Sequence, residues 1–79
     1  MLINGEKEGY EMPKAARVLA GLRRDGWVQI RQKGSHRRLT KGDVEASFAF
    51  HDSKDLGPTD HAHVAKQFGY TLEELRELL

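Results

Sequence analysis

The sequence predicts an α+β domain in which one helix is followed by a three-stranded antiparallel sheet and two further helices. Apolar residues recur at helical spacing up to residue 24, alternate with polar residues from 27 to 51, and return to helical spacing after residue 59. Glycine-containing dipeptides at 34–35 and 42–43 divide the alternating segment into three strands. Because the chain has only 79 residues, we expect a single domain over residues 12–79.

The first helix is expected to begin at Pro13 and to end before Asp25 and Gly26. Proline suits the first helical position because the N–H that it lacks has no partner there, and a glycine after the last turn stops a helix. Four residues at helical spacing form the apolar stripe: Ala15, Val18, Leu19 and Leu22. Residues 1–11 show no apolar period and contain two glycines, so we expect a flexible leader there.

Residues 27–33, 36–41 and 44–51 are the three expected strands. Val28 and Ile30 share one face of the first strand, with Gln29 and Arg31 on the other, and Leu39 is the main apolar residue of the second. In the third strand the apolar positions are Val44, Ala46, Phe48 and Phe50. Short turns make neighbouring strands antiparallel, and the helices must then cover the one apolar face.

Two helices complete the expected order. Thr59 or Asp60 can cap a helix that runs to Phe68 and stops at Gly69. Thr71, with Glu74 three residues later, forms a capping box for the last helix. The expected buried edge of that helix is Leu72, Leu75, Leu78 and Leu79.

Composition excludes several classes of protein. The chain has no cysteine, so disulfides, thiolate zinc sites and a cysteine nucleophile are excluded. Its longest apolar runs are two or three residues, too short for a membrane-spanning helix or a signal-peptide core. No glycine-rich phosphate loop opens a helix. We therefore expect a cytoplasmic protein that is not attached to a membrane and uses no cofactor.

Charge is sorted along the chain although the formal net charge is only +1. Residues 13–43 carry nine lysines or arginines against two acids, a balance of +7, whereas residues 44–79 have a balance of −4. Such sorting predicts one basic face and a polyanionic partner.

The residues most suited to chemistry lie in the first hairpin, from Arg31 to Arg38. Backbone N–H groups at the turn of Gly34 and Ser35 can approach an anion. Phosphates can be held by the cations of the hairpin, which are Arg31, Lys33, Arg37 and Arg38. Among those phosphates, His36 could take a proton from a ribose 2′-hydroxyl or give one to the leaving 5′-oxygen, with no metal. The alternative is a basic hairpin tip in which the histidine is incidental.

Other candidate residues have simpler explanations. His51, beside Asp52, could assist His36 as a helper residue, although a histidine at a strand end is more often a solvated surface residue. His61 and His63 are one residue apart, a spacing that points them to different sides of a helix, so we expect no metal site. Trp27 is expected in the core rather than as a base-stacking platform.

Four segments together resemble the HicA family of toxin proteins. They are Leu22–Trp27 (LRRDGW), Arg31–His36 (RQKGSH), His51 ahead of Lys54 and Leu56, and Ala65–Tyr70 (AKQFGY). The resemblance implies a fold similar to a double-stranded-RNA-binding domain. It also implies an mRNA interferase, an endoribonuclease that a HicB antitoxin silences. The family's catalytic histidine corresponds to His36, and Lys33, Gly34 and Ser35 match the surrounding motif.

The sequence departs from the family pattern in two places. Arg37 stands where a second histidine is common, and the segment Thr59–His61 replaces a Gly-Thr pair and an apolar residue at the start of the second helix. Two other function classes stay open beside the toxin nuclease. One is a non-catalytic double-stranded-RNA-binding module, and the other is a structural or antitoxin-like partner protein with negligible affinity for RNA.

Overall fold

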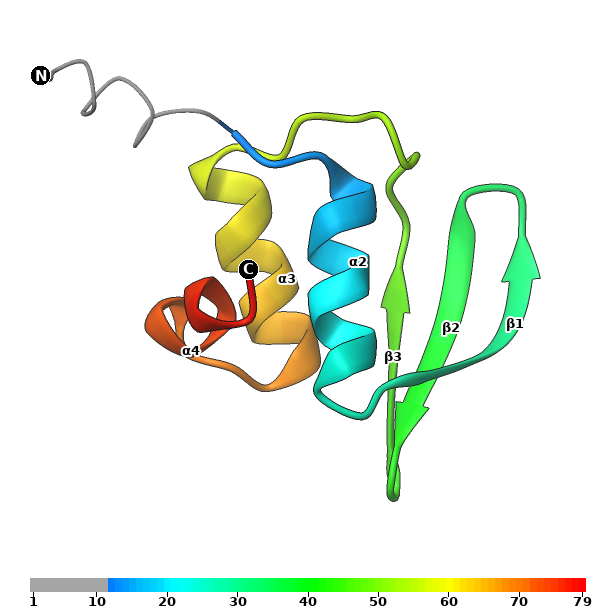
Figure 1. The fold of residues 1–79 in the computed structure, drawn as a ribbon. Helices are drawn as coiled ribbons and strands as arrows, with labels where there is room; N and C mark the ends of the chain where they lie inside the picture. The colour runs from blue at the N-terminus through cyan, green and yellow to red at the C-terminus, as the bar shows by residue number, and fades with distance from the viewer. Residues whose placement is uncertain (1–11) are drawn as a thin grey trace, which may run out of the picture.

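The computed structural model describes residues 12–79 (Figure 1), and the predicted leader at residues 1–11 lies outside the described residues. In chain order the elements are α2 (Ala15–Arg24), β1 (Val28–Lys33), β2 (His36–Lys41), β3 (Val44–Phe48), α3 (Pro58–Phe68) and α4 (Leu72–Glu77). The predicted α+β order of a helix, three strands and two helices is confirmed.

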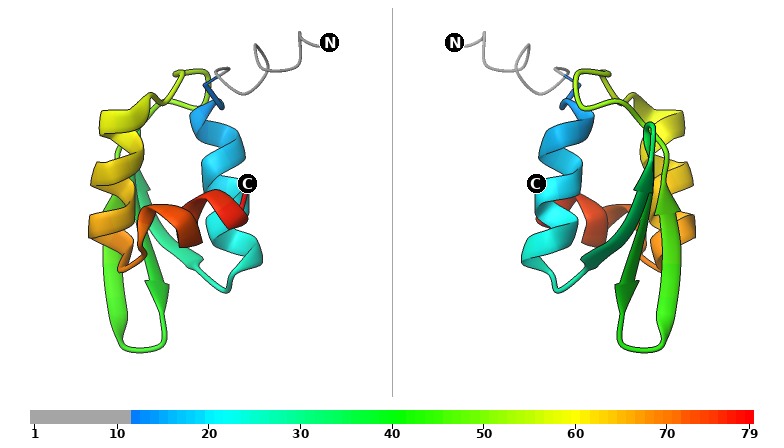
Figure 2. Two further views of the ribbon diagram at one scale, coloured as in Figure 1. Left: turned by 90° about the vertical axis from the view of Figure 1, so that its left-hand side faces the viewer. Right: turned by 90° about the vertical axis from the view of Figure 1, so that its right-hand side faces the viewer.

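The sheet has the antiparallel order β1-β2-β3. Helices α2 and α3 pack on the β3 side, and β1 is the edge strand farthest from them (Figure 1). Helix α4 runs from the end of α3 across to α2 (Figure 2). Arg17 and Arg24 of α2 donate hydrogen bonds to the carbonyl oxygens of Leu79 and Leu78, at 2.9 and 2.6 Å. These bonds tie the end of the chain to the first helix.

Aromatic rings form the centre of the core between the helices and the sheet. The ring of Trp27 meets that of Phe68 edge to face, with centroids 4.8 Å apart, and Phe48 meets Phe50 in the same way at 5.5 Å. Leu39 and Ala46 are buried beside them on the helix-facing side of the sheet. The prediction that Trp27 belongs to the core is confirmed.

Several predicted core positions are exposed. Val28 is 59% exposed because it lies on the face of the sheet that the helices do not cover, and Ile30 is 51% exposed because β1 lies beyond the cover of the helices. Val44 is 53% exposed because it begins β3 at the turn with β2, outside the helical layer. Leu72, in the first turn of α4, is 38% exposed, whereas Leu75 one turn later is buried. The sequence analysis therefore predicted more buried apolar residues than the helices and the sheet cover.

Two element boundaries also differ from the prediction. Strand β3 ends at Phe48, which pairs with Arg37, the second residue of β2. The carbonyl oxygen of Asp52 then accepts a hydrogen bond from the N–H of Ala16 in α2. His51 therefore lies outside the strand. Helix α3 begins at Pro58, because the N–H that proline lacks has no partner at the first helical position. Gly57 is the N-cap residue, and Asp60 accepts a hydrogen bond from the Gly57 N–H at 3.3 Å.

A polar network joins the end of α2, the end of β2 and the segment between α3 and α4. Trp27 Nε1 donates to the Tyr70 hydroxyl at 2.9 Å, and that hydroxyl donates to the carboxylate of Asp25. Lys41 Nζ, at the end of β2, is 2.8 Å from the same carboxylate. The network fixes the end of α2 against the sheet and against the segment that links α3 to α4.

We expect Gly21→Ala to destabilise the fold by about 1 kcal/mol. A Cβ at Gly21 would lie 2.6 Å from the Leu78 carbonyl oxygen, and overpacking of about 1–3 kcal/mol outweighs the gain in helix propensity of about 1 kcal/mol. Urea unfolding measures the change. In a chain shortened to end at Glu77 the same substitution should stabilise, and an equal loss in both chains would contradict the close contact.

Stability should also depend on pH through Asp25. Hydrogen bonds from Lys41, and then from Tyr70, hold the pKa of Asp25 below its ordinary value of 3.8. A depressed carboxyl pKa adds stability that is present above the unfolded value and is lost as pH falls through the folded one. We therefore expect Asp25→Asn to lower stability in urea unfolding at pH 6, and the gap to the unsubstituted chain to narrow as pH falls below 3.8. A gap independent of pH would contradict this.

Candidate functional site

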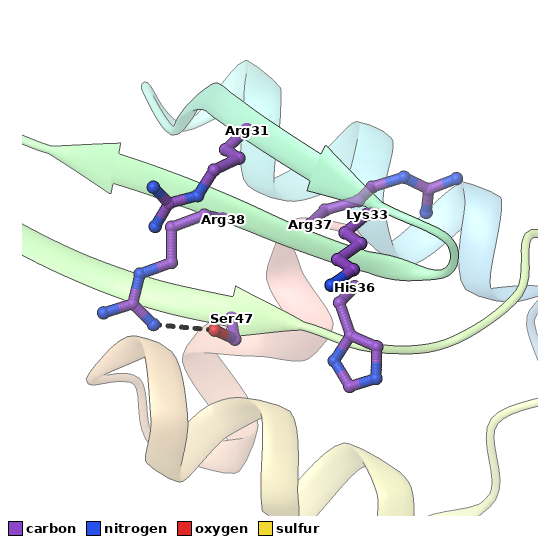
Figure 3. A pocket seen from close by; sticks show the side chains of 6 residues that line it. All are labelled: Arg31, Lys33, His36, Arg37, Arg38 and Ser47. Carbon is purple, nitrogen blue, oxygen red and sulfur yellow. Dashed lines mark hydrogen bonds between the residues drawn. The ribbon is translucent and has the colours of Figure 1, made fainter.

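The open face of the sheet carries a shallow hollow of about 230 Å³ near the first hairpin. Side chains from all three strands surround it (Figure 3). The register places Lys33 opposite His36, Arg31 opposite Arg38, and Arg38 opposite Ser47. The lining residues are Arg31, Lys33, His36, Arg37, Arg38 and Ser47. Cations of the first hairpin thus surround a histidine and a serine hydroxyl.

A bulge in β1 decides which side chains reach this face. Gln29 pairs with Leu39 and Arg31 pairs with Arg38, so Ile30 has no directly opposed residue in β2. One extra residue reverses the alternation of the strand after it. Val28 and Arg31 consequently share the open face, which contradicts the prediction that they lie on opposite faces. Without the bulge, Arg31 and Lys33 would share the helix-facing side with Leu39.

His36 is exposed at the first position of β2. Its ring projects from the end of the central strand into solvent, next to Lys33 (Figure 3). None of the residues from 12 to 79 forms a hydrogen bond with the ring. An exposed imidazole with both nitrogens open can accept or donate a proton to a bound molecule.

Gly34 and Ser35 form the turn between Lys33 and His36. Gly34 has a φ of +61°, a conformation that favours glycine, and a Cβ there would meet nothing within 4 Å. Its carbonyl oxygen accepts a hydrogen bond from Gln32 Nε2 at 3.0 Å. Neither residue lines the hollow, so the turn closes the hairpin beside it.

Ser47 is the lining residue that the sequence analysis missed. Arg38 Nη1 donates to Ser47 Oγ at 2.7 Å, and Arg38 Nε donates to Glu45 at 3.0 Å. The signal was present in the alternation of β3, because Ala46 and Phe48 face the helices and Ser47 must face the other way. The contact between Ser47 and Arg38 could be found only from the register between β2 and β3.

Arg37 contributes to the lining of the hollow, but its guanidinium does not join the other cations. Its Nη2 lies 2.7 Å from Asp52 Oδ1, and its Nη1 donates to the Phe50 carbonyl oxygen at 3.5 Å. Only 11% of its side chain is exposed. In Figure 3 the side chain runs behind the sheet, away from Arg38 and His36. Arg37 therefore holds the segment after β3 against β2.

The other histidines lie apart from the hollow. His51 is exposed in the segment after β3, and His63 is exposed on α3. His61 is half-buried, and burial, followed by the charge of Arg76, lowers its pKa. In the part of the chain that the structure describes, no three histidine or carboxylate side chains gather as a metal site would require. No helix within residues 12–79 is long and apolar enough to cross a membrane.

An α+β domain with one helix-covered sheet face and a basic open face that carries an exposed histidine is suited to binding a polyanion. Comparison with known families identifies the class further. A family model described as the HicA toxin of bacterial toxin-antitoxin systems matches residues 15–70. The chain belongs to the HicA toxin family, so its role is that of a toxin with a cognate antitoxin partner. No curated protein is significantly similar in sequence.

Arg37 and Arg31 should differ in their effect on stability. We expect Arg37→Ala to cost about 1 kcal/mol, because it breaks a charged hydrogen bond to a carboxylate that is itself mostly exposed. Arg31→Ala removes the same charge from a side chain with no described partner and should change stability by less than about 0.5 kcal/mol. Thermal unfolding of both variants makes the comparison. Equal losses would show that the ion pair with Asp52 has no structural role.

Proposed function

We propose that this chain is a metal-independent endoribonuclease that cleaves mRNA, with His36 as its general acid–base residue. The observation that carries the proposal is the position of His36, exposed on the open face and paired in register with Lys33. Arg31 and Arg38 lie on the same face and supply charge for the RNA backbone. Membership of the HicA toxin family adds support, since a toxin must act on some essential component of its cell.

The proposed reaction needs one nucleophile, which RNA itself provides. His36 takes the proton of a ribose 2′-hydroxyl, and the 2′-oxygen attacks the adjacent phosphorus. The bond from phosphorus to the 5′-oxygen breaks, and that oxygen takes a proton from solvent. The products are a 2′,3′-cyclic phosphate and a free 5′-hydroxyl. Lys33, which lies opposite His36 in the register, stabilises the negative charge on the phosphate oxygens during the transfer.

Each of the other predicted RNA contacts has a different place in this proposal. Arg31, Lys33 and Arg38 bind phosphates, and the turn of Gly34 and Ser35 shapes the edge of the site. Arg37 is left out of the contact set because Asp52 engages its guanidinium on the other face. His51 does not line the hollow, so its helper role stays a prediction.

The partner and the compartment follow from the same proposal. A HicB-like antitoxin would silence the nuclease by covering the basic open face with acidic side chains, which would exclude RNA from His36. The substrate, mRNA, would be met in the cytoplasm.

We expect His36→Ala to lower the rate of RNA cleavage at least a hundredfold, because loss of a general acid–base group typically costs about 10²–10⁴-fold. The variant should fold normally, since the ring is exposed. The assay follows an end-labelled mRNA fragment on a gel, with EDTA present. His63→Ala, which removes another exposed histidine, should cut at the normal rate.

The alternative candidate is a non-catalytic binder of double-stranded RNA, favoured by the order of helix, sheet and helices and by the basic face. Such a protein would bind a perfect duplex, lose affinity steeply as salt rises and leave every RNA intact. Intact mRNA with salt-sensitive duplex binding would therefore replace the nuclease proposal. Cleavage by His36→Ala at the normal rate would reject the role of the histidine alone.

A further inference from the structure

Two side chains of β3 hold Arg38 in one orientation. Its Nε donates to Glu45 Oε1 at 3.0 Å, and its Nη1 donates to Ser47 Oγ at 2.7 Å (Figure 3 shows the second bond). Ser47 lies opposite Arg38 in the register, and Glu45 precedes it by two residues on the same face. Within residues 12–79, no hydrogen bond or ion pair of this kind holds the side chains of Arg31 or Lys33.

The Arg38 guanidinium has N–H donors that Glu45 and Ser47 do not engage. A guanidinium carries five N–H donors, and Glu45 and Ser47 engage one on Nε and one on Nη1. The remaining donors, including both on Nη2, are open to an acceptor, since the side chain is 40% exposed. A cation that is already oriented loses less conformational entropy on binding than one that rotates freely. Arg38 is therefore prepared to bind an anion in one direction.

Glu45 needs an explanation on a face that is otherwise basic. Its side chain is 49% exposed, and ion pairs that exposed contribute little to stability. Its negative charge also opposes the binding of a polyanion. Neither stability nor attraction for RNA accounts for a carboxylate at this point. Orientation of the Arg38 guanidinium does account for it.

We infer that Glu45 and Ser47 are positioning residues, which fix Arg38 so that it holds the phosphate next to the scissile one and thereby places the scissile linkage against His36. This inference rests on the proposed function. Arg38 and His36 are two residues apart on the same face of β2, so their Cα atoms are about 7 Å apart, the length scale of one nucleotide. A misplacement of about 1 Å can cost a hundredfold in rate.

Substitution of Glu45 tests whether this residue acts by orienting the Arg38 guanidinium or only through its negative charge. If only charge mattered, Glu45→Gln would remove repulsion, tighten RNA binding and leave the cleavage rate unchanged or higher. If orientation matters, kcat falls although the binding of RNA holds or improves. Ser47→Ala should behave in the same way without any change in charge. Asp43→Asn is the matched control. It also removes an exposed carboxylate, but Asp43 lies in the β2–β3 turn and does not contact Arg38.

The experiment measures kcat and KM for cleavage of a labelled mRNA fragment, and RNA affinity in a His36→Ala background. We expect Glu45→Gln and Ser47→Ala each to lower kcat about tenfold, with affinity within about twofold of the parent or tighter. Arg38→Lys, which keeps the charge but loses the planar fork, should show the same loss. Asp43→Asn should keep the parental kcat.

Three results would overturn the inference. A parent that cuts RNA while Glu45→Gln and Ser47→Ala retain the kcat of Asp43→Asn would reject the positioning role alone. A parent that leaves mRNA intact would reject the proposed nuclease and this inference with it. Loss of affinity without loss of kcat would assign Glu45 and Ser47 to binding rather than to positioning, and would also reject the inference.

Discussion

The arrangement depends on packing that covers one face of the sheet only. Leu39, Ala46 and Phe48 face the helices and are buried with Trp27 and Phe68. A chain this short has too few apolar side chains to cover a second face, because a small domain buries a smaller fraction of its surface on folding than a large one does. The opposite face is therefore free to carry charge at little cost to stability. Concentration of cations around His36 is compatible with the fold for that reason.

The bulge at Ile30 converts this free face into a candidate site. It reverses the alternation of β1, so that Arg31 and Lys33 join Arg38 and His36 on one surface. The bulge also leaves Ile30 exposed on an edge strand. Bulges and charged side chains on an edge strand hinder pairing with another chain. One local irregularity thus serves both the charge of the open face and the protection of the edge.

Stability and proposed chemistry are assigned to different residues. The network of Trp27, Tyr70, Asp25 and Lys41 joins α2, the end of β2 and the segment between α3 and α4. The proposed RNA contacts lie at the other end of β2, around the first hairpin. Arg37 shows how close in sequence the two groups are, since it stands between His36 and Arg38 and yet serves the fold. Adjacent residues of a strand point to opposite faces, which allows this division.

The sequence alone determined the order of the elements, the core role of Trp27 and the exposed hairpin with its histidine. Periodicity and glycine turns are local signals, and they do not depend on distant contacts. The face on which Arg31 lies, the separation of Arg37 from Arg38, and the contacts of Ser47 and Glu45 were decided by tertiary structure. A one-residue bulge and the register between strands set these features, and neither can be derived from the alternation of a single strand.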